Sequence, residues 1–316
     1  MFKHTIIFAA IAGSVFAATP AKQVNMQWVH VGNAGNAAGA RGYGAVAYDY
    51  YIGKYEVTWT QYAAFLNAVA ATDKYDLYHA SMGSMTFATR GGITRNGVSG
   101  SYTYSVKIGF QNRPAAYISW YDAIRFANWI TGGATESGSY TITEGGPDSG
   151  TVIIPDAAER AAWAKSGKTY VLLPSEDEWY KAACHKNDGV TGNYWDYPNA
   201  GNKPPKATTP ADQLKESPGS ANYDNKVKAT TEVGAYATAS PYGTHDQGGN
   251  VYEWNEGLRS SDRSKRVFRG GSFGSDAGTL RASNRSDIDP KYENYIVGFR
   301  VSKIAPAPTT KPTRPK

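Results

Sequence analysis

The sequence predicts an α+β fold that combines short strands, a few short helices and much irregular loop. Three helix-start signals are separated by long segments with only brief β-type runs. The 316 residues include 34 Gly, 23 Tyr and 8 Trp, while only 19% are charged. Disordered chains lack aromatic residues and coiled coils carry charged heptads, so both classes are excluded. A hydrophobic fraction of 41% over this length is enough for a core.

Each of the three expected helices begins at a Ser or Thr that can cap its first turn. Thr58 and Ser175 are each followed three residues later by a Gln or Glu, which is the spacing of a capping box. Ser119 precedes another such segment, which stops at Gly132 and Gly133. Apolar residues recur three and four positions apart in all three, so each segment predicts a short helix with one buried face.

Short β-type runs occupy part of the remaining sequence. They cover residues 50–55, 102–108, 140–143, 168–173, 267–269 and 298–302. Residues 194–249 consist largely of Gly, Pro, Asn, Asp and Tyr and have few periodic apolar positions. A loop of that length in a compact domain usually needs side chains or ions to organise it.

The net charge of +6 comes mostly from the two ends of the chain. Lys3 lies near the start, and Lys311, Arg314 and Lys316 lie in the last segment. Subtracting these four from the 33 basic residues leaves 29 against 27 acidic residues. That balance predicts neither nucleic acid nor an anionic membrane as a partner.

The chain divides into four parts. Residues 1–17 resemble a secretory signal peptide, with an apolar run that is too short to span a membrane; the alternative is a buried N-terminal strand. Residues 18–44 form a lead-in, residues 45–304 the main domain, and residues 305–316 a Pro/Thr/Lys-rich tail or linker. We expect an exported protein in the periplasm, at the cell surface or outside the cell. Cys184 is the only cysteine, so no internal disulfide can form.

Five sequence blocks occur in order along the main domain. They read Ile-Gly-Lys-Tyr-Glu-Val-Thr at 52–58, Ile-Ser-Trp-Tyr-Asp-Ala at 118–123, Leu-Pro-Ser-Glu-Asp-Glu-Trp at 173–179, Gly-Gly-Asn-Val-Tyr-Glu-Trp at 248–254, and Arg-Gly-Gly-Ser-Phe at 269–273 with Gly-Phe-Arg at 298–300. Together they resemble the formylglycine-generating enzyme, or sulfatase-modifying factor, family over roughly residues 45–304. The resemblance implies a C-type-lectin-like fold with short twisted antiparallel sheets.

Several residues of these blocks have a structural interpretation. We expect Trp120, Trp179 and Trp254 to anchor the core. Glu56 and Glu178 stand beside aromatic residues and are expected to accept hydrogen bonds as buried or capping groups.

The residues that would hold a redox metal are missing. Copper-dependent family members carry a cysteine pair shortly after the Gly-Gly-Ser block, because Cu(I) prefers thiolate ligands. Here Ser275 stands where the first cysteine is expected, and the second position holds no cysteine either. We therefore expect no copper, and Cys184 is expected to be a small buried hydrophobic residue.

An iron centre is not expected either. The iron-dependent relatives, which resemble the sulfoxide synthases of ergothioneine biosynthesis, take histidines from an additional helical domain. His30, His79, His185 and His245 show no metal-ligand spacing, and the chain has no such domain. Enzymatic activity stays open, with a non-catalytic domain favoured. The alternative is an oxidoreductase of the formylglycine-generating or nonheme-iron class that uses an unrecognised centre.

The resemblance implies structural calcium. Carboxylate and backbone oxygens are the ligands that calcium prefers. One site maps onto the side chains of Asp246 and Glu253 and the carbonyls of Gly249 and Val251, with turn-capping acids as the alternative. A second site maps onto the side chains of Asn222 and Asn225 and the carbonyls of Tyr223 and Val227, where Asp224 could replace the expected acid.

Two C-terminal stretches form a candidate surface for a protein or glycan ligand. In the variable proteins of diversity-generating retroelements, which share this fold, corresponding stretches resemble a diversified binding surface. Tyrosines there could offer flat amphipathic contact area, while the alternative is an ordinary turn-rich loop over the core. Lys291 and Glu293 would be fixed framework positions. The candidate residues are Gly274, Ser275, Asp276, Ala277, Gly278, Thr279, Ser286, Asp287, Ile288, Asp289, Tyr292 and Tyr295.

Overall fold

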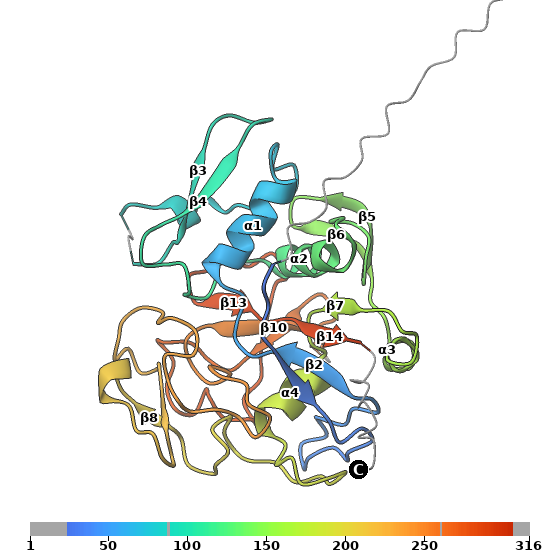
Figure 1. Cartoon of the computed structure of the whole chain (residues 1–316), viewed down its shortest axis with the longest axis vertical. Helices are drawn as coiled ribbons and strands as arrows, with labels where there is room; N and C mark the ends of the chain where they lie inside the picture. The colour runs from blue at the N-terminus through green and yellow to red at the C-terminus, as the bar shows by residue number, and fades with distance from the viewer. Residues whose placement is uncertain (1–23, 87–88, 260, 306–316) are drawn as a thin grey trace, which may run out of the picture.

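The computed structural model describes residues 24–86, 89–259 and 261–305. The predicted signal peptide and the predicted tail after Ala305 lie outside the described residues. Across those three ranges, no helix is long and apolar enough to cross a membrane. The described residues form four short α-helices and several small sheets joined by long loops, as an α+β fold requires (Figure 1).

The first four-stranded sheet places the last strand of the chain between two earlier ones. Its strands, in spatial order, are β1 (Trp28–Val31), β2 (Tyr50–Gly53), β14 (Ser302–Ile304) and β7 (Tyr170–Leu172). All neighbours in it are antiparallel, and Ser302 pairs with Ile52 on one side and Leu172 on the other. These three residues are fully buried, so β14 lies at the centre of the core.

The second four-stranded sheet includes residues from the last two sequence blocks, at 248–254 and at 269–273 with 298–300. Its strands, in spatial order, are β12 (Ser286–Ile288), β11 (Arg266–Arg269), β10 (Tyr252–Leu258) and β13 (Val297–Phe299). β10 and β13 are parallel, unlike the purely antiparallel sheets that we expected. The reason is that residues 289–296 cross from β12 at one edge to β13 at the other, and this crossover brings β13 back in the direction of β10.

Smaller two-stranded pairs complete the β structure. They are β3 (Ile93–Asn96) with β4 (Thr103–Val106), β5 (Thr141–Gly146) with β6 (Ser149–Ile153), and the parallel pair β8 (Lys206–Ala207) with β9 (Ser220–Ala221).

The three predicted helices are confirmed, and a fourth was missed. The helices are α1 (Trp59–Val69), α2 (Trp120–Gly132), α3 (Ala157–Trp163) and α4 (Glu176–Cys184), with short 3-10 turns η1 (Ala80–Gly83) and η2 (Pro210–Asp212). All four α-helices begin with a reciprocal capping box. α2 is followed by Gly133, whose φ of 81° is the left-handed conformation typical of glycine after a helix. The missed helix α3 is capped by Asp156, and the capping partner Glu159 was visible in the sequence.

Two strand predictions failed at buried charges. Residues 298–302 were expected to form one strand, but they belong to β13 and β14, which lie in different sheets. The fully buried Arg300 lies between the two strands and forms an ion pair with Glu253. β10 was missed because it carries Glu253, Asn255 and Glu256, which break the apolar pattern of a buried strand. The structure compensates these charges with Arg300 and Arg160.

The tryptophan anchors are confirmed. Trp120, Trp179 and Trp254 are at most 2% exposed. Trp120 Nε1 donates to the Asn255 carbonyl at 3.1 Å, and Trp254 Nε1 donates to the Ile118 carbonyl at 2.8 Å. These reciprocal bonds attach the N-terminal end of α2 to β10, and both indoles keep a hydrogen-bond partner in the core.

The predicted role of the two buried glutamates is also confirmed. Glu178 is fully buried and accepts from the Ser175 amide at 2.9 Å, as the capping box requires, and from the Tyr48 hydroxyl at 2.7 Å. Glu56 is 1% exposed and accepts from Asn250 Nδ2 at 3.1 Å.

Side chains organise much of the long polar loop at residues 194–249. The Tyr223 hydroxyl donates to the Pro205 carbonyl, and the Tyr236 hydroxyl donates to the Thr208 carbonyl, both at 2.7 Å. Asn199 Nδ2 donates to the Pro218 carbonyl at 2.7 Å. These bonds between distant loop residues supplement the two-residue β8–β9 pair, which lies in the same segment.

Candidate functional site

Hydroxyl groups surround the position where the family resemblance places the first copper-binding cysteine. The Ser275 hydroxyl accepts from the Ser272 amide at 2.9 Å and lies 3.3 Å from the Ser272 hydroxyl. It also lies 3.4 Å from the Tyr252 hydroxyl, which belongs to β10. Protonated hydroxyls are poor ligands for a soft copper ion. The local hydrogen bonds therefore stabilise a loop built from neutral groups.

The single cysteine lies in the core. Cys184 ends α4, is fully buried and packs with Trp179, Tyr180 and Ala282. Burial raises the pKa of its thiol to about 12, so the reactive thiolate is not formed at neutral pH. The residue behaves as the small buried group that its helical position predicted.

The first candidate ligand stretch is an exposed turn on a buried base. Gly274, Asp276 and Gly278 are exposed, whereas Phe273 and Leu280 on either side are buried. Asp276 Oδ1 accepts from the Thr279 amide at 2.8 Å and from the Thr279 hydroxyl at 2.9 Å. These bonds fix the turn and lower the pKa of Asp276. Ala277 packs against the small Tyr197–Ala221–Tyr223–Leu280 cluster.

The second candidate stretch has two parts. Ser286, Asp287 and Ile288 form β12, so the loop expected there begins only after them. β12 pairs with β11 at the edge of the second sheet, and Asp287 bonds Arg259 at 3.0 Å. Asp289 Oδ1 accepts from the Lys291 amide at 2.9 Å and begins the crossover.

The crossover brings one candidate tyrosine to the first stretch. The centroid of the Tyr295 ring lies 6.0 Å from that of the Phe273 ring. The guanidinium of Arg90 lies over the Tyr295 ring, 3.9 Å from its centroid. Tyr292 and Tyr295 both pack against the main core. The structure thus joins Tyr295 to the base of the 274–279 turn, while the residues of β12 lie in an edge strand.

Arg300 dominates the first candidate calcium site. Its guanidinium donates to both carboxylate oxygens of Glu253 at 2.6 Å, and Trp179 Nε1 donates to the same carboxylate at 2.7 Å. Asp246 Oδ2 accepts from the Gly234 amide at 2.6 Å. Burial raises the pKa of Asp246 to about 6. Because the guanidinium already neutralises Glu253, this donor set fits a cation poorly, although Asp246, Gly249, Val251 and Glu253 lie in one short segment.

The second candidate calcium site has a free buried acceptor. Asn222 is 2% exposed, and its Nδ2 donates to the Ala229 carbonyl at 2.9 Å, whereas its Oδ1 is buried without a hydrogen-bond partner. Asp224 and Asn225 adopt positive φ angles of 55° and 53°, which tighten the loop. Among the described residues, no three His, Cys, Asp or Glu side chains are placed to hold a metal ion. A cation here would depend on amide and carbonyl oxygens, which calcium accepts.

The loop of the second candidate calcium site supports the first ligand stretch. The Asp224 amide donates to the Ser275 carbonyl, and the Asn225 amide donates to the Phe273 carbonyl, both at 2.8 Å. Two sites that were predicted separately are therefore in direct contact.

Sequence reasoning missed a cluster of three acids under the crossover. Asp122 in α2, Asp148 in the β5–β6 turn and Glu293 in the crossover each have a buried carboxylate oxygen without a hydrogen-bond partner. Burial, followed by Asp122 and Asp148, raises the pKa of Glu293 to about 10. Glu293 itself is partly buried, with its Oε1 enclosed beside the two aspartates. No spacing in the sequence joins these three positions.

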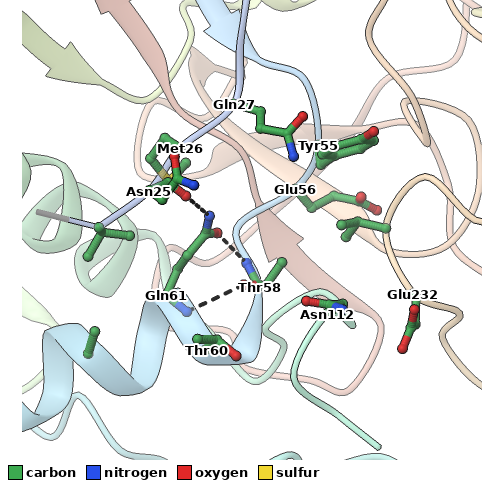
Figure 2. Close-up of a pocket in the computed structure, with 13 residues that line it drawn as sticks. Asn25, Met26, Gln27, Tyr55, Glu56, Thr58, Thr60, Gln61, Asn112 and Glu232 are labelled. Atoms are coloured by element: carbon green, nitrogen blue, oxygen red, sulfur yellow. Dashed lines mark hydrogen bonds between the residues drawn. The ribbon is translucent and has the colours of Figure 1, made fainter.

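Sequence reasoning also missed a cavity beside Glu56 (Figure 2). It has a volume of about 560 Å³ and lies between the lead-in, the start of α1 and the loops at Asn112 and Glu232. Glu56 was predicted only as a structural acceptor. Its Oε2 is buried and has no hydrogen-bond partner, and burial, with Asp246 and Glu253, raises its pKa.

Comparison with protein families identifies the domain. The family described as "Sulfatase-modifying factor enzyme 1-like domain" matches residues 20–305. The chain belongs to this family. As a sulfatase-modifying factor domain it has the C-type-lectin-like fold of formylglycine-generating enzymes, and its one cysteine cannot provide their copper-binding pair.

Known relatives of the domain have diverse names. The chain is 26% identical over 215 residues to the serine/threonine-protein kinase pkn1 of Chlamydia caviae, covering 63% of this chain and 25% of the kinase. It is 30% identical over 171 residues to the hercynine oxygenase of Mycolicibacterium smegmatis, covering 46% of this chain and 35% of the oxygenase. The chain thus spans only a quarter to about a third of these two relatives.

A solved structure supports the fold. The variable protein 1 of Treponema denticola is similar with a TM-score of 0.55 and 23% identity, covering 90% of this chain and 98% of that one. At this level of identity the likeness shows a shared fold.

Proposed function

We propose that this domain is an exported, non-catalytic module that binds a protein or glycan ligand through residues 274–279 and 286–295. The observation that carries the proposal is the hydroxyl network of Ser272, Ser275 and Tyr252, in which Ser275 stands where the family resemblance places the first copper-binding cysteine. A loop at that position that carries no metal ligands can contact a bound molecule instead of taking part in oxidation.

The shape of the surface supports a binding role. The exposed turn at Gly274–Gly278 rests on buried Phe273 and Leu280, so its side chains can change without altering the core. Tyr295 contributes an aromatic ring beside that turn, and aromatic rings are frequent in binding surfaces. The structural neighbour from Treponema denticola is itself named a variable protein. We include in the proposal that these stretches are diversified by a retroelement.

Structural calcium is part of the proposal. The ion would use Asn222 Oδ1, which has no partner, together with neighbouring carbonyls. Because this loop bonds the backbone of Phe273 and Ser275, the ion would hold the base of the binding turn in place.

An oxidoreductase remains the second candidate function, and the similarity to hercynine oxygenase favours it. The two functions assign different roles to the polar residues of the 274–279 loop. In an oxidoreductase they would take part in the chemistry, whereas in a binding module they would contact the ligand.

Binding arrays test the proposal directly. The purified protein is applied to glycan and peptide arrays beside a variant in which residues 274–279 are exchanged for another polar sequence. A matched control exchanges residues 261–265, another exposed segment. We expect the first exchange to change the array pattern and the control to leave it unchanged, with similar melting temperatures. Identical patterns for all three proteins would contradict the proposal.

Export has a separate test. We expect mass spectrometry of the protein from its native host to find a mature chain that begins at or next to Ala18. An intact Met1 would contradict export.

A further inference from the structure

A second cavity lies where the β5–β6 hairpin, the starts of α3 and α4, and the hairpin of β10 and β11 meet. Its volume of about 470 Å³ falls within the range of small-molecule sites. Two of its lining residues are arginines: Arg266 belongs to β11, and Arg263 belongs to the turn that joins β10 to β11. None of the described residues that line it belongs to 274–279 or 286–295, so the cavity is separate from the proposed ligand surface.

Arg266 is a half-buried cation that forms no ion pair within the described chain. Its guanidinium lies over the Trp120 ring, 4.0 Å from the ring centroid, and its Nη1 donates to the Glu256 carbonyl at 3.1 Å. Nε and Nη2 have no hydrogen-bond partner among the described residues, and both remain accessible, unlike the enclosed Nη1 of Arg125. Burial lowers the pKa of Arg266, but an arginine side chain stays protonated at neutral pH. The two nitrogens are therefore charged donors that a ligand can reach.

Arg263 adds a second unpaired charge to the same cavity. The other basic residues of the turn pair with aspartates: Arg259 with Asp287 at 3.0 Å, and Lys265 with Asp262 at 4.0 Å. Arg263 is exposed and has no such partner in the described part of the chain. It is a smaller cause of the lowered pKa of Arg266, after burial, because two like charges lie close together. An anion between the two guanidiniums would offset this repulsion.

The acids in the cavity wall are already bound by the protein. The carboxylate of Glu256 bonds Arg160, and that of Glu176 accepts from Arg269 Nε at 2.8 Å and from Arg285 Nε at 2.7 Å. The third acid of the wall is the N-cap residue of α3, and it accepts from two amides in the first turn of that helix. The acids are thus engaged, whereas the two arginines of the wall keep open donors. The cavity therefore favours a negatively charged ligand.

The remaining wall is largely apolar. Val152 of β6, Leu258 of β10, and Ile154 and Pro155 in the segment before α3 line this part. Apolar walls with a few placed charged groups are typical of small-molecule sites. An inorganic anion would leave the apolar surface uncovered, whereas an anion with an apolar group would cover it and gain from its burial.

We propose that this cavity binds a small organic anion, a phosphate monoester or a carboxylate, that carries an apolar group. Nε and Nη2 of Arg266 donate to two oxygens of the anion, which is the bidentate geometry that arginine forms with carboxylates and phosphates. Arg263 adds its charge from the turn, and the apolar group packs against Val152, Ile154 and Leu258. The site does not rest on the proposed ligand surface. Its ligand is a free small molecule, so the exchange of residues 261–265 remains a control for the arrayed peptides and glycans.

Four small molecules test the assignment. Phenyl phosphate, 3-phenylpropionate, 2-phenylethanol and inorganic phosphate are titrated into the full chain by calorimetry at neutral pH. We expect at least one of the two phenyl anions to bind at least about tenfold more tightly than the uncharged alcohol, as a charge-assisted hydrogen bond requires. It should also bind more tightly than inorganic phosphate, which lacks the apolar group, and the tighter of the two anions identifies the head group. Equal affinity for the alcohol, tighter binding of inorganic phosphate, or no binding of either phenyl anion would overturn the proposal.

Variants locate the site with the tighter of the two anions. Arg266→Met keeps an apolar contact with Trp120 and removes the charged donors, and we expect it to weaken binding at least about tenfold. Because Arg266 is half-buried and its variant could misfold, Arg263→Gln in the exposed turn provides a second test, with an expected loss of about threefold to fivefold. Arg259→Gln removes the same charge from the same turn outside the cavity lining, and this matched control should bind like the wild type. If folded Arg266→Met and Arg263→Gln proteins both bind like the control, the assignment is wrong.

Discussion

Replacement of Glu293 by glutamine is expected to stabilise the protein at neutral pH. Glu293 shares a buried site with Asp122 and Asp148, and its pKa is raised from 4.5 to about 10. Arg125 bonds Glu136 through its Nε at 2.7 Å. Arg125 and Lys291 both lower the pKa of Asp148, but neither is among the main causes of the shift at Glu293. The carboxyl group is therefore protonated in the folded protein and ionised in the unfolded chain at pH 7.

The raised pKa sets the direction and size of the effect. Unfolding releases a proton from Glu293, so the free energy of unfolding falls as pH rises from about 4.5 to about 10. Each pH unit is worth about 1.4 kcal/mol, so the loss at pH 7 is about 3 kcal/mol at most. Glutamine keeps the shape without the proton equilibrium. It should recover roughly 1–3 kcal/mol at pH 7 and almost nothing at pH 4.5.

Urea unfolding at several pH values measures this effect. The wild-type protein, Glu293→Gln and the exposed-site control Glu216→Gln are compared at pH 4.5, 7 and 9. We expect the advantage of Glu293→Gln to grow with pH, while the control follows the wild type. A pH-independent difference, or a variant that is less stable at pH 9, would refute the reasoning.

Three further predictions concern the metal sites and the buried ion pair. Chelation of calcium should lower the melting temperature, since a ligand at a hundredfold excess over its Kd adds about 2.7 kcal/mol to the free energy of unfolding. Asn222→Leu should abolish this response to chelator, whereas Glu253→Gln should retain it. Identical melting curves with and without chelator would count against calcium. The purified protein, loaded with copper, should not convert the cysteine of a sulfatase-type peptide to formylglycine in a mass-spectrometric assay, and detection of the aldehyde would disprove the non-catalytic proposal. Arg300→Met should destabilise the fold by about 3–5 kcal/mol, because Glu253 then loses its buried cationic partner. In thermal unfolding, the double variant Arg300→Met/Glu253→Gln should recover part of this loss. No recovery would show that the pair is not coupled.

The sequence predicted the fold well where a residue type in a given pattern usually has one structural role, such as a capping Ser or Thr or a core Trp. The capping residues Thr58, Ser119 and Ser175 located three helices, and the tryptophans located the core. The prediction failed at Glu253 and Arg300, because charged residues usually indicate the surface and only the folded chain brings this pair together.

The candidate sites were predictable only in part. The departure at Ser275 could be found in the sequence, because the family blocks fix its position. The contact between the Asp224–Asn225 loop and the 274–279 turn could not be found, since nothing local joins segments so far apart. The Glu56 cavity and the Asp122–Asp148–Glu293 cluster depend on unsatisfied atoms, which become visible only once the neighbours of each side chain are known.

The central position of β14 affects how the domain can assemble during synthesis. β2 and β7 leave the ribosome long before Ser302–Ile304, the strand that joins them. Until then β7 has no neighbour in its sheet, and β2 has an open edge, which can pair with other chains. Contacts between such distant segments also slow folding, because a large loop must close first. A nascent chain therefore cannot complete its first sheet until nearly all of the domain has been made, and a chain that ends before residue 302 would keep both edges open to aggregation.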